Sequence, residues 1–384
     1  MRFEFATATR IVFGRGRIAE VGAIAKSFGN AALVVTGKSL NRAKPLLDQL
    51  DAEGIAHTKY SINGEPRVAD VRHGVERAKA GRCDMVVSFG GGSAIDCGKA
   101  ISAMLTNPGD VIDYLEVIGK GQAISEPAAP FIAIPTTAGA GAEVTKNAVL
   151  ASPEKKVKAS LRSVLMLPRV ALVDPELAVN LPAEVTAATG MDALTQLIEP
   201  YTCCRTNPLT DALCRDGIPR AARSLRKAVE QGDDLAARED MALASLLGGL
   251  ALANSGLGAV HGFAAPLGGM FPAPHGAVCA ALLAPVMEAN VKALRDRYAE
   301  SDTLTRYYEV ARWLTGDAEA TANVGVEWVR QLAADLKIPG LSSYGIQESD
   351  IPDLVDKAGK ASSMKANPIP LTAAELTTIV KAVW

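Results

Sequence analysis

Histidine is scarce in this chain, and the cysteine and charge patterns that mark several protein classes are missing. The six cysteines include no Cys-x-x-Cys pair and no short disulfide-like spacing, so we expect reduced thiols. Lysine plus arginine (40) nearly balances aspartate plus glutamate (42), which leaves no basic surface for a nucleic-acid backbone and argues against nucleic acid as a partner. The N-terminus lacks the apolar segment of a secretory signal, so we expect a cytoplasmic protein.

Charged side chains are absent from residues 241–287, which raises the question of a membrane span. Glycines and prolines such as Gly248, Pro266 and Pro272 interrupt any uniform lipid-facing helix, and two histidines in this stretch would need partners in hydrocarbon. We therefore expect no membrane segment. Small residues here let helices and a ligand approach closely in a protein interior.

Strand and helix patterns alternate up to about residue 180. The expected strands are 31–36, 57–62, 85–89, 131–134 and 170–173, and the expected helices are 43–53, 68–80 and 93–105. The alternation of apolar and polar residues over 1–10 also predicts a strand. This order predicts an α/β domain over residues 1–180, with a mostly parallel, Rossmann-like sheet wrapped by helices.

Strand patterns disappear beyond Pro182, and long Ala/Leu-rich runs follow. They predict helices such as 211–229, 236–254 and 301–313. Proline and the shift in composition coincide just before this point, which places the domain boundary there. We therefore expect an all-α C-terminal domain over residues 181–384.

Four residues predict a small buried metal site. Asp192 and Gln196 lie four residues apart in a run that predicts a helix, so their side chains share one face. His261 and His275, half of the histidines in the chain, lie in the uncharged stretch. Carboxylate, amide and imidazole groups all bind metals. From spacing alone, the same residues are also compatible with hydrogen-bonded positions in a core.

A glycine turn joins the strand 85–89 to the following helix. Gly91 and Gly92 let the backbone approach a pyrophosphate, and the helix N-terminus attracts its charge. Ser93 and Asp96 also fit a capping box. The Gly-x-Gly-x-x-Gly fingerprint fails at Ile95, so the turn alone is equally compatible with a tight structural junction.

A second small-residue loop follows the strand 131–134. The hydroxyls of Thr136 and Thr137 in this loop could hold a ribose or a phosphate. Threonine-rich turns are also common without ligands. The two loops together indicate a dinucleotide site more strongly than either does alone.

A series of motifs runs along essentially the whole chain. In order, they are Gly90-Gly91-Gly92-Ser93 with Asp96 and Lys99, Pro135-Thr136-Thr137-Ala138-Gly139 with Glu143-Val144-Thr145, Asp174-Pro175, Gly190-Met191-Asp192-Ala193-Leu194-Thr195, Asn207-Pro208-Leu209-Thr210-Asp211-Ala212, His261-Gly262 and Pro274-His275-Gly276. With these motifs the chain resembles the iron-containing alcohol dehydrogenase family. The resemblance implies an NAD(P)-binding α/β domain, a helical domain, a hydride carrier, a divalent metal (Fe²⁺ or Zn²⁺), a small alcohol or carbonyl substrate, and a homodimer.

Two positions depart from the pattern that the resemblance implies. Asp192, His261 and His275 match three metal ligands, but Gln196 stands where the family usually has a histidine. Two imidazoles and a carboxylate still suffice for a catalytic metal, with the glutamine oxygen as a weak fourth ligand. Ala265 stands where many members have a histidine proposed to assist proton transfer, so the sequence identifies no proton-relay residue.

The cofactor residues implied by the resemblance include Lys158, expected near the nicotinamide ribose. Gly37 stands where several members carry an aspartate that would bond the ribose and repel a 2′-phosphate. Glycine removes that barrier, and Lys38, Ser39 or Arg42 could contact the phosphate. This favours NADP, or use of both NAD and NADP.

We therefore expect an NAD(P)-dependent enzyme that interconverts a small alcohol and its aldehyde or ketone with the help of a metal. One alternative is a metal-independent reductase of an oxoacid, similar to maleylacetate reductases, on the same fold. Another is a catalytically silent nucleotide-binding protein. Intact loops and three retained ligand positions argue against the silent protein.

Overall fold

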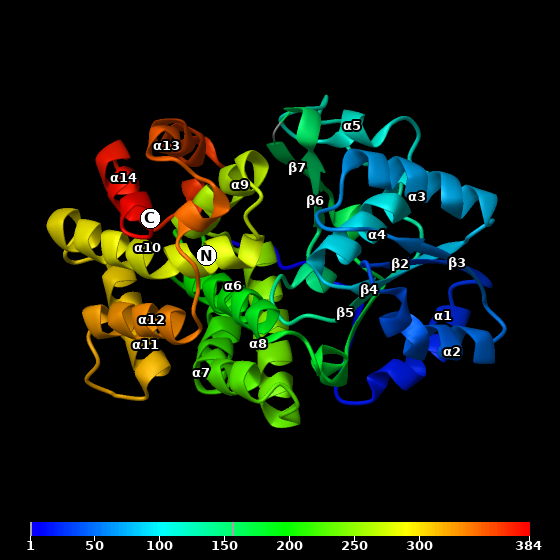
Figure 1. Cartoon of the computed structure of the whole chain (residues 1–384), viewed down its shortest axis with the longest axis horizontal. Coiled ribbons are helices and arrows are strands. Elements are labelled where there is room, and N and C mark those ends of the chain that lie inside the picture. The colour runs from blue at the N-terminus through cyan, green and yellow to red at the C-terminus, as the bar shows by residue number, and fades with distance from the viewer. Residues whose placement is uncertain (1, 156) are drawn as a thin grey trace. The chain divides into compact units, whose positions relative to one another are not determined.

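The computed structural model describes residues 2–155 and 157–384, and these form two compact units (Figure 1). The sheet unit comprises Phe5–Thr137 and Gly141–Ala178. The helical unit comprises Ala138–Ala140 and Val179–Trp384, with a short N-terminal segment up to Glu4.

The sheet unit is built on six strands in the order β1-β8-β5-β4-β2-β3, and every neighbouring pair is parallel. This confirms the predicted parallel sheet. The buried apolar runs fold as strands because both faces of such a sheet are covered. The strands are β1 (Arg10–Phe13), β2 (Ala31–Thr36), β3 (Ala56–Ser61), β4 (Met85–Gly90), β5 (Phe131–Pro135) and β8 (Val170–Val173).

The strand expected over residues 1–10 is wrong for all but its last residue. Residues 2–8 adopt no strand, and β1 begins at Arg10, opposite Val170. A strand needs a hydrogen-bonded neighbouring strand, and the neighbour of β1, β8, begins only at Val170. The residues before Arg10 therefore have no strand to pair with. Alternation of side chains by itself does not supply that neighbour.

Helices cover both faces of the sheet, as Figure 1 shows, with α1 and α2 on one side and α3 and α4 on the other. Val34, Val87 and Ile132 lie on one face in register and pack with α1 and α2. On the opposite face α4 packs so closely against β4 that a Cβ at Gly98 would lie 2.0 Å from Ser88 Oγ. The helices are α1 (Val21–Lys26), α2 (Lys44–Ala52), α3 (Val68–Ala80), α4 (Gly92–Thr106) and α5 (Val111–Tyr114).

An antiparallel pair, β6 (Asn147–Ser152) and β7 (Val157–Arg162), completes the sheet unit and was not predicted. Its buried positions carry small or medium side chains such as Ala148 and Ala159, so the sequence shows no strong apolar alternation.

The strand order reverses between β2 and β4. The chain leaves β2 to form β3 on one side and returns to form β4 on the other. In open parallel sheets, ligands bind beyond the carboxyl ends of the strands at such a point. Gly37 follows β2 and Gly91 follows β4, so both lie at this edge.

The helical unit confirms the predicted all-α region, and its described residues contain no strand. The helices pack around α6, whose buried face runs through most of its length. They are α6 (Ala183–Thr202), α7 (Pro208–Glu230), α8 (Leu235–Asn254), α9 (Ala259–Met270), α10 (His275–Arg297), α11 (Asp302–Thr315), α12 (Ala322–Asp335), α13 (Ile351–Lys360) and α14 (Ala373–Lys381).

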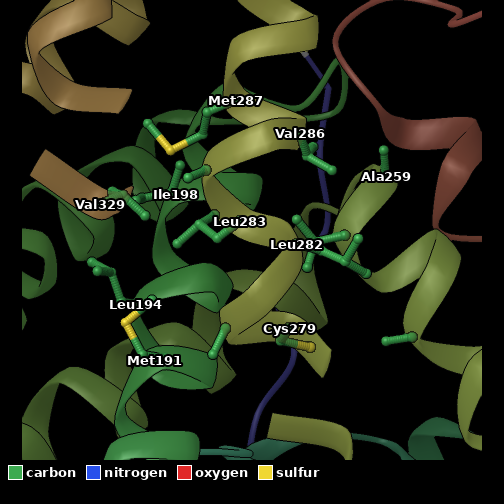
Figure 2. Close-up of a cluster of buried hydrophobic side chains, with 14 of the residues drawn as sticks. Met191, Leu194, Ile198, Ala259, Cys279, Leu282, Leu283, Val286, Met287 and Val329 are labelled. Atoms are coloured by element: carbon green, nitrogen blue, oxygen red, sulfur yellow. The ribbon is translucent and has the colours of Figure 1, made fainter. Parts of the chain in front are cut away.

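By length and composition α10 could cross a membrane, but 78% of its apolar window is buried inside the structure. Figure 2 shows Leu283 and Met287 of α10 beside Leu194 and Ile198 of α6. Helices α8 and α9 pass the same test only as a pair bent by 95°. Burial in the core of the helical unit accounts for the apolar character of α10.

Two of the sequence motifs have structural roles. Asp174 accepts hydrogen bonds from the backbone N–H groups of Gly16 (3.2 Å) and Ile18 (3.0 Å), which fixes the turn after β1. Asn207 caps α7 by accepting from the N–H groups of Leu209 and Thr210. These motifs therefore support the scaffold.

Candidate metal centre and dinucleotide loops

Helix α6 presents three polar side chains from one face. Asp192, Gln196 and Glu199 lie at positions i, i+4 and i+7, so they share that face, and each is at most 5% exposed. Such burial is uncommon for charged residues unless they are paired or bind a metal. The local pattern of α6 therefore places three oxygen-bearing groups inside the helical unit.

Two imidazoles meet the first of these groups. His261 Nε2 in the first turn of α9 lies 3.5 Å from Asp192 Oδ1. His275 Nε2, at the first residue of α10, lies 3.8 Å from the same oxygen. The two ring centroids are 5.4 Å apart. The structure thus brings together the carboxylate and both histidines that the sequence singles out.

Two buried oxygens on α6 have no hydrogen-bond partner among the described residues: Asp192 Oδ1 and Gln196 Oε1. An unpaired buried polar atom costs about 1–3 kcal/mol, and more when it is charged. A divalent cation would remove that cost at Asp192. The donor set of carboxylate oxygen and imidazole nitrogen fits Fe²⁺ or Zn²⁺.

Glu199 orients the first imidazole. His261 Nδ1 donates to Glu199 Oε2 at 2.6 Å, and the backbone N–H of Val260 donates to Glu199 Oε1 at 2.7 Å. With Nδ1–H held by Glu199, Nε2 is the ring nitrogen directed at Asp192, and it would be the atom offered to a bound cation. Glu199 was not predicted, although its spacing of seven residues from Asp192 was a readable signal.

Negative charge dominates the electrostatics of this cluster. Burial opposes ionisation of Asp192, yet the two histidines lower the pKa of its carboxyl below the ordinary value. Burial would lower the pKa of His261, but Cys279, Asp192 and Glu199 raise it well above the ordinary value. Cys279 and Asp192 raise the pKa of His275 to about 9, against the effect of burial. The cluster thus stabilises positive charge.

Cys279 is the second residue that the sequence did not single out. Its sulfur lies 4.0 Å from His261 Nε2 and 3.8 Å from His275 Nε2, and the side chain is fully buried. Its sulfur, one Asp192 carboxylate oxygen and one nitrogen of each histidine form a group of four donor atoms. All four lie within 4.8 Å of one another. The readable signal was its spacing of four residues from His275.

The dinucleotide loops come together at the carboxyl edge of the sheet. A Cβ at Gly91 would lie 3.2 Å from Thr137 Oγ1, and a Cβ at Gly90 would lie 3.5 Å from the backbone nitrogen of Gly37. Thr136 N–H donates to Gly90 O at 3.0 Å. The two predicted loops and the Gly37 turn therefore form one continuous surface.

The first turn of α4 differs from the sequence prediction. The N-cap is Gly91 and no side chain caps the helix, so the capping box of Ser93 and Asp96 is wrong. The helix already begins at Gly92, so Ser93 lies inside the first turn and cannot be the N-cap residue. Asp96 Oδ2 accepts from Val149 N–H at 3.0 Å instead.

Lys99 shapes the loop that follows Thr137. It is fully buried, and its Nζ donates to Ala142 O (2.8 Å), Thr145 Oγ1 (3.0 Å) and Asn147 O (2.8 Å). Burial lowers its pKa to about 8. Burial also raises the pKa of the neighbouring Glu143 to about 7. These motif residues hold the loop in shape.

Two further positions singled out by the sequence are an ion-paired lysine and an exposed alanine. Lys158 lies on β7 and its Nζ is 3.1 Å from Glu65 Oε1, so it is an ion-paired and largely buried lysine. Ala265 is exposed on α9, one turn after His261.

The sheet with its glycine loops and the buried carboxylate–imidazole cluster define an α/β protein with a second, helical unit that contains a candidate metal centre. A family model for iron-containing alcohol dehydrogenases matches residues 8–175, and one for the C-terminal part of Fe-containing alcohol dehydrogenases matches residues 186–384. The chain therefore belongs to the iron-containing alcohol dehydrogenase family. It is an alcohol dehydrogenase enzyme of the alcohol/aldehyde oxidoreductase class.

Individual relatives agree with this assignment. The chain is 36% identical to 1,3-propanediol dehydrogenase of Citrobacter freundii, over 95% of each chain. It is also 36% identical to the NAD-dependent methanol dehydrogenase of Bacillus methanolicus, over 96% of this chain and 97% of that one. The crystal structure of a 1,3-propanediol oxidoreductase superimposes with a TM-score of 0.93 at 34% identity and covers 100% of both chains.

Proposed function

We propose that this enzyme uses NAD(P) to interconvert a small alcohol and its aldehyde or ketone, assisted by a divalent metal. Asp192, His261 and His275 would hold the metal, and the oxygen of Gln196 is a further candidate ligand. The relatives named for methanol and 1,3-propanediol support a small alcohol as the substrate class. We assign no side chain to proton transfer.

One observation carries the metal part of the proposal. Asp192 Oδ1 is buried and accepts no hydrogen bond, yet it faces two imidazole Nε2 atoms at 3.5 and 3.8 Å. Hydrogen bonding in a core would have satisfied that oxygen. A shared cation explains the convergence of the three side chains.

The residues of the chain have distinct parts in the proposed reaction. A bound metal would polarise the substrate oxygen while the nicotinamide ring gives or takes the hydride. Asp192 supplies the negative charge that retains the cation. Glu199 holds the Nδ1–H of His261 and so keeps Nε2 aimed at the cation. The apolar core around α10 limits access of water from within the helical unit.

The carboxyl edge of the sheet supports dinucleotide binding. No side chain caps α4, so its N-terminus offers free backbone N–H groups to a pyrophosphate. A Cβ at Gly37 would meet nothing within 4 Å, and Lys38 and Arg42 are exposed nearby. These features favour a 2′-phosphate, and we propose that the enzyme accepts NADP as well as NAD.

The proposal is tested by metal analysis together with turnover. Protein purified without chelator should contain about one divalent metal per chain and oxidise NADPH with short aldehydes. Asp192→Ala should lose the metal and the activity but keep dinucleotide binding, whereas the exposed control Asp233→Ala should keep all three. Full turnover after chelation would instead support the metal-independent reductase. Tight NADPH binding without turnover on any aldehyde or ketone would support the silent protein.

The cofactor preference has its own test. Gly37→Asp places a carboxylate where the site has room for it. Repulsion of the 2′-phosphate should lower kcat/KM for NADPH relative to NADH by roughly tenfold or more, equivalent to about 1.4 kcal/mol. An unchanged ratio of the two values would show that Gly37 does not face the adenosine ribose.

A further inference from the structure

The group of donor atoms described above contains a sulfur that the proposed metal ligands leave out. Cys279 follows His275 by one turn of α10, so both side chains leave the same face of that helix. Figure 2 shows Cys279 on α10 with its sulfur directed away from Met191, at the edge of the apolar cluster. The sulfur reaches the carboxylate–imidazole group rather than the middle of the core.

The distances fit coordination of one ion. Bonds of about 2.0–2.3 Å to a tetrahedral ion place its donor atoms about 3.3–3.6 Å apart. The observed separations are 3.5 and 3.8 Å from Asp192 to the imidazoles, and 4.0 and 3.8 Å from Cys279 Sγ to the same nitrogens. The four donor atoms all lie within 4.8 Å of one another, so side-chain shifts of about 1 Å would close the group around an ion. A single thiol proton, in contrast, could bond only one of the two nitrogens.

The charge balance of the site also favours a thiolate ligand. A divalent ion held by one carboxylate, two neutral imidazoles and one neutral glutamine would leave a net positive charge in a place where, of the four donor residues grouped here, only His275 is partly exposed. A thiolate in addition to the Asp192 carboxylate makes the ion and its ligands neutral, which low dielectric surroundings favour. Cys279 loses its proton to solvent when the ion binds, as thiol ligands do.

We propose that the Cys279 thiolate is the fourth metal ligand in this enzyme, beside Asp192, His261 and His275, and that it selects Zn²⁺ over Fe²⁺. Thiolate is a softer donor than imidazole or an amide oxygen, and zinc combines readily with mixed nitrogen, oxygen and sulfur ligands. The ion can expand to a fifth position, which stays available to a substrate oxygen. This inference depends on the metal centre of the proposed function.

Cobalt substitution tests the ligand directly. Metal-free enzyme loaded with Co²⁺ should show an intense near-ultraviolet sulfur-to-cobalt charge-transfer band. Cys279→Ser should lose this band, and its affinity for Zn²⁺ relative to Fe²⁺ should fall on the order of 10- to 100-fold. The matched control is Cys214→Ser, because Cys214 is equally buried in the same unit but lies outside the group. Circular dichroism and NADPH binding report whether each variant is folded.

X-ray absorption of the unmodified zinc enzyme makes the result independent of any substitution. One sulfur at about 2.3 Å from zinc is expected, beside nitrogen and oxygen ligands. Zinc with nitrogen and oxygen ligands alone, together with an unchanged cobalt spectrum in Cys279→Ser, would overturn the thiolate ligand and leave the metal-assisted dehydrogenase intact. Enzyme that retains no metal and turns over fully with chelator would overturn both proposals.

Discussion

Replacing Glu199 by glutamine tests whether the orientation of His261 determines metal retention. The carboxylate accepts from two donors at once, His261 Nδ1 at 2.6 Å and Val260 N at 2.7 Å. Glutamine has one acceptor oxygen, so whichever way its amide turns, its NH₂ group faces one of these donors. The exchange therefore removes one charge-assisted hydrogen bond and leaves a buried donor unpaired.

The size of the effect follows from these contacts. A hydrogen bond to a charged group contributes about 1.5–3 kcal/mol, and an unpaired buried donor costs about 1–3 kcal/mol. We expect the metal-free Glu199→Gln variant to unfold with a free energy lower by about 2–4 kcal/mol. Loss of a carboxylate behind a ligating histidine commonly weakens metal binding by about 10- to 100-fold.

Two measurements separate these effects. Competition with a chromophoric chelator gives the dissociation constant for Zn²⁺, and urea unfolding with chelator gives the stability of the metal-free enzyme. Glu184→Gln is the control, because Glu184 is exposed on the same helix. If Glu199→Gln bound Zn²⁺ within threefold of the parent enzyme and kept its stability within about 0.5 kcal/mol, His261 would not depend on Glu199.

Two further predictions concern the sheet unit. Burial raises the pKa of Glu143 from 4.5 to about 7, so stability falls as pH rises from about 4.5 to 7, because the unfolded chain releases this proton first. Urea unfolding should show Glu143→Gln gaining on the order of 3 kcal/mol relative to the parent over that range, and a constant difference would contradict the raised pKa. Gly91→Val should clash with Thr137 and weaken NADPH binding by roughly tenfold or more without changing metal content. Gly359→Val, in open space, is its control, and equal fluorescence titrations for the two variants would remove Gly91 from the cofactor surface.

The sequence predicts the parts of the fold that depend on strong local patterns. The run 31–36 is apolar in its first five residues, and it folds as β2 with the same bounds. The weakly patterned strands β6 and β7 were missed, because their pairing is decided by neighbours rather than by composition. The false strand near the N-terminus has the same cause. Local periodicity does not report which segments find a hydrogen-bonded partner.

The candidate metal centre shows the same limit. The spacing of Asp192 and Gln196 is readable because both lie on one helix. The approach of His261 and His275 from α9 and α10 depends on how three helices pack, and no local pattern encodes it. Only the family resemblance indicated that the two histidines would meet Asp192. The spacing between cysteines does not single out Cys279, because its informative neighbour is a histidine one turn away.

The division of the chain into units has a consequence for how such an enzyme can fail. Every atom of the candidate metal group belongs to the helical unit, and the glycine and threonine loops at the strand reversal belong to the sheet unit. A substitution can therefore abolish metal binding while dinucleotide binding is kept. Another substitution can abolish dinucleotide binding while metal binding is kept. Inactive variants should fall into two separable kinds, told apart by one metal assay and one titration.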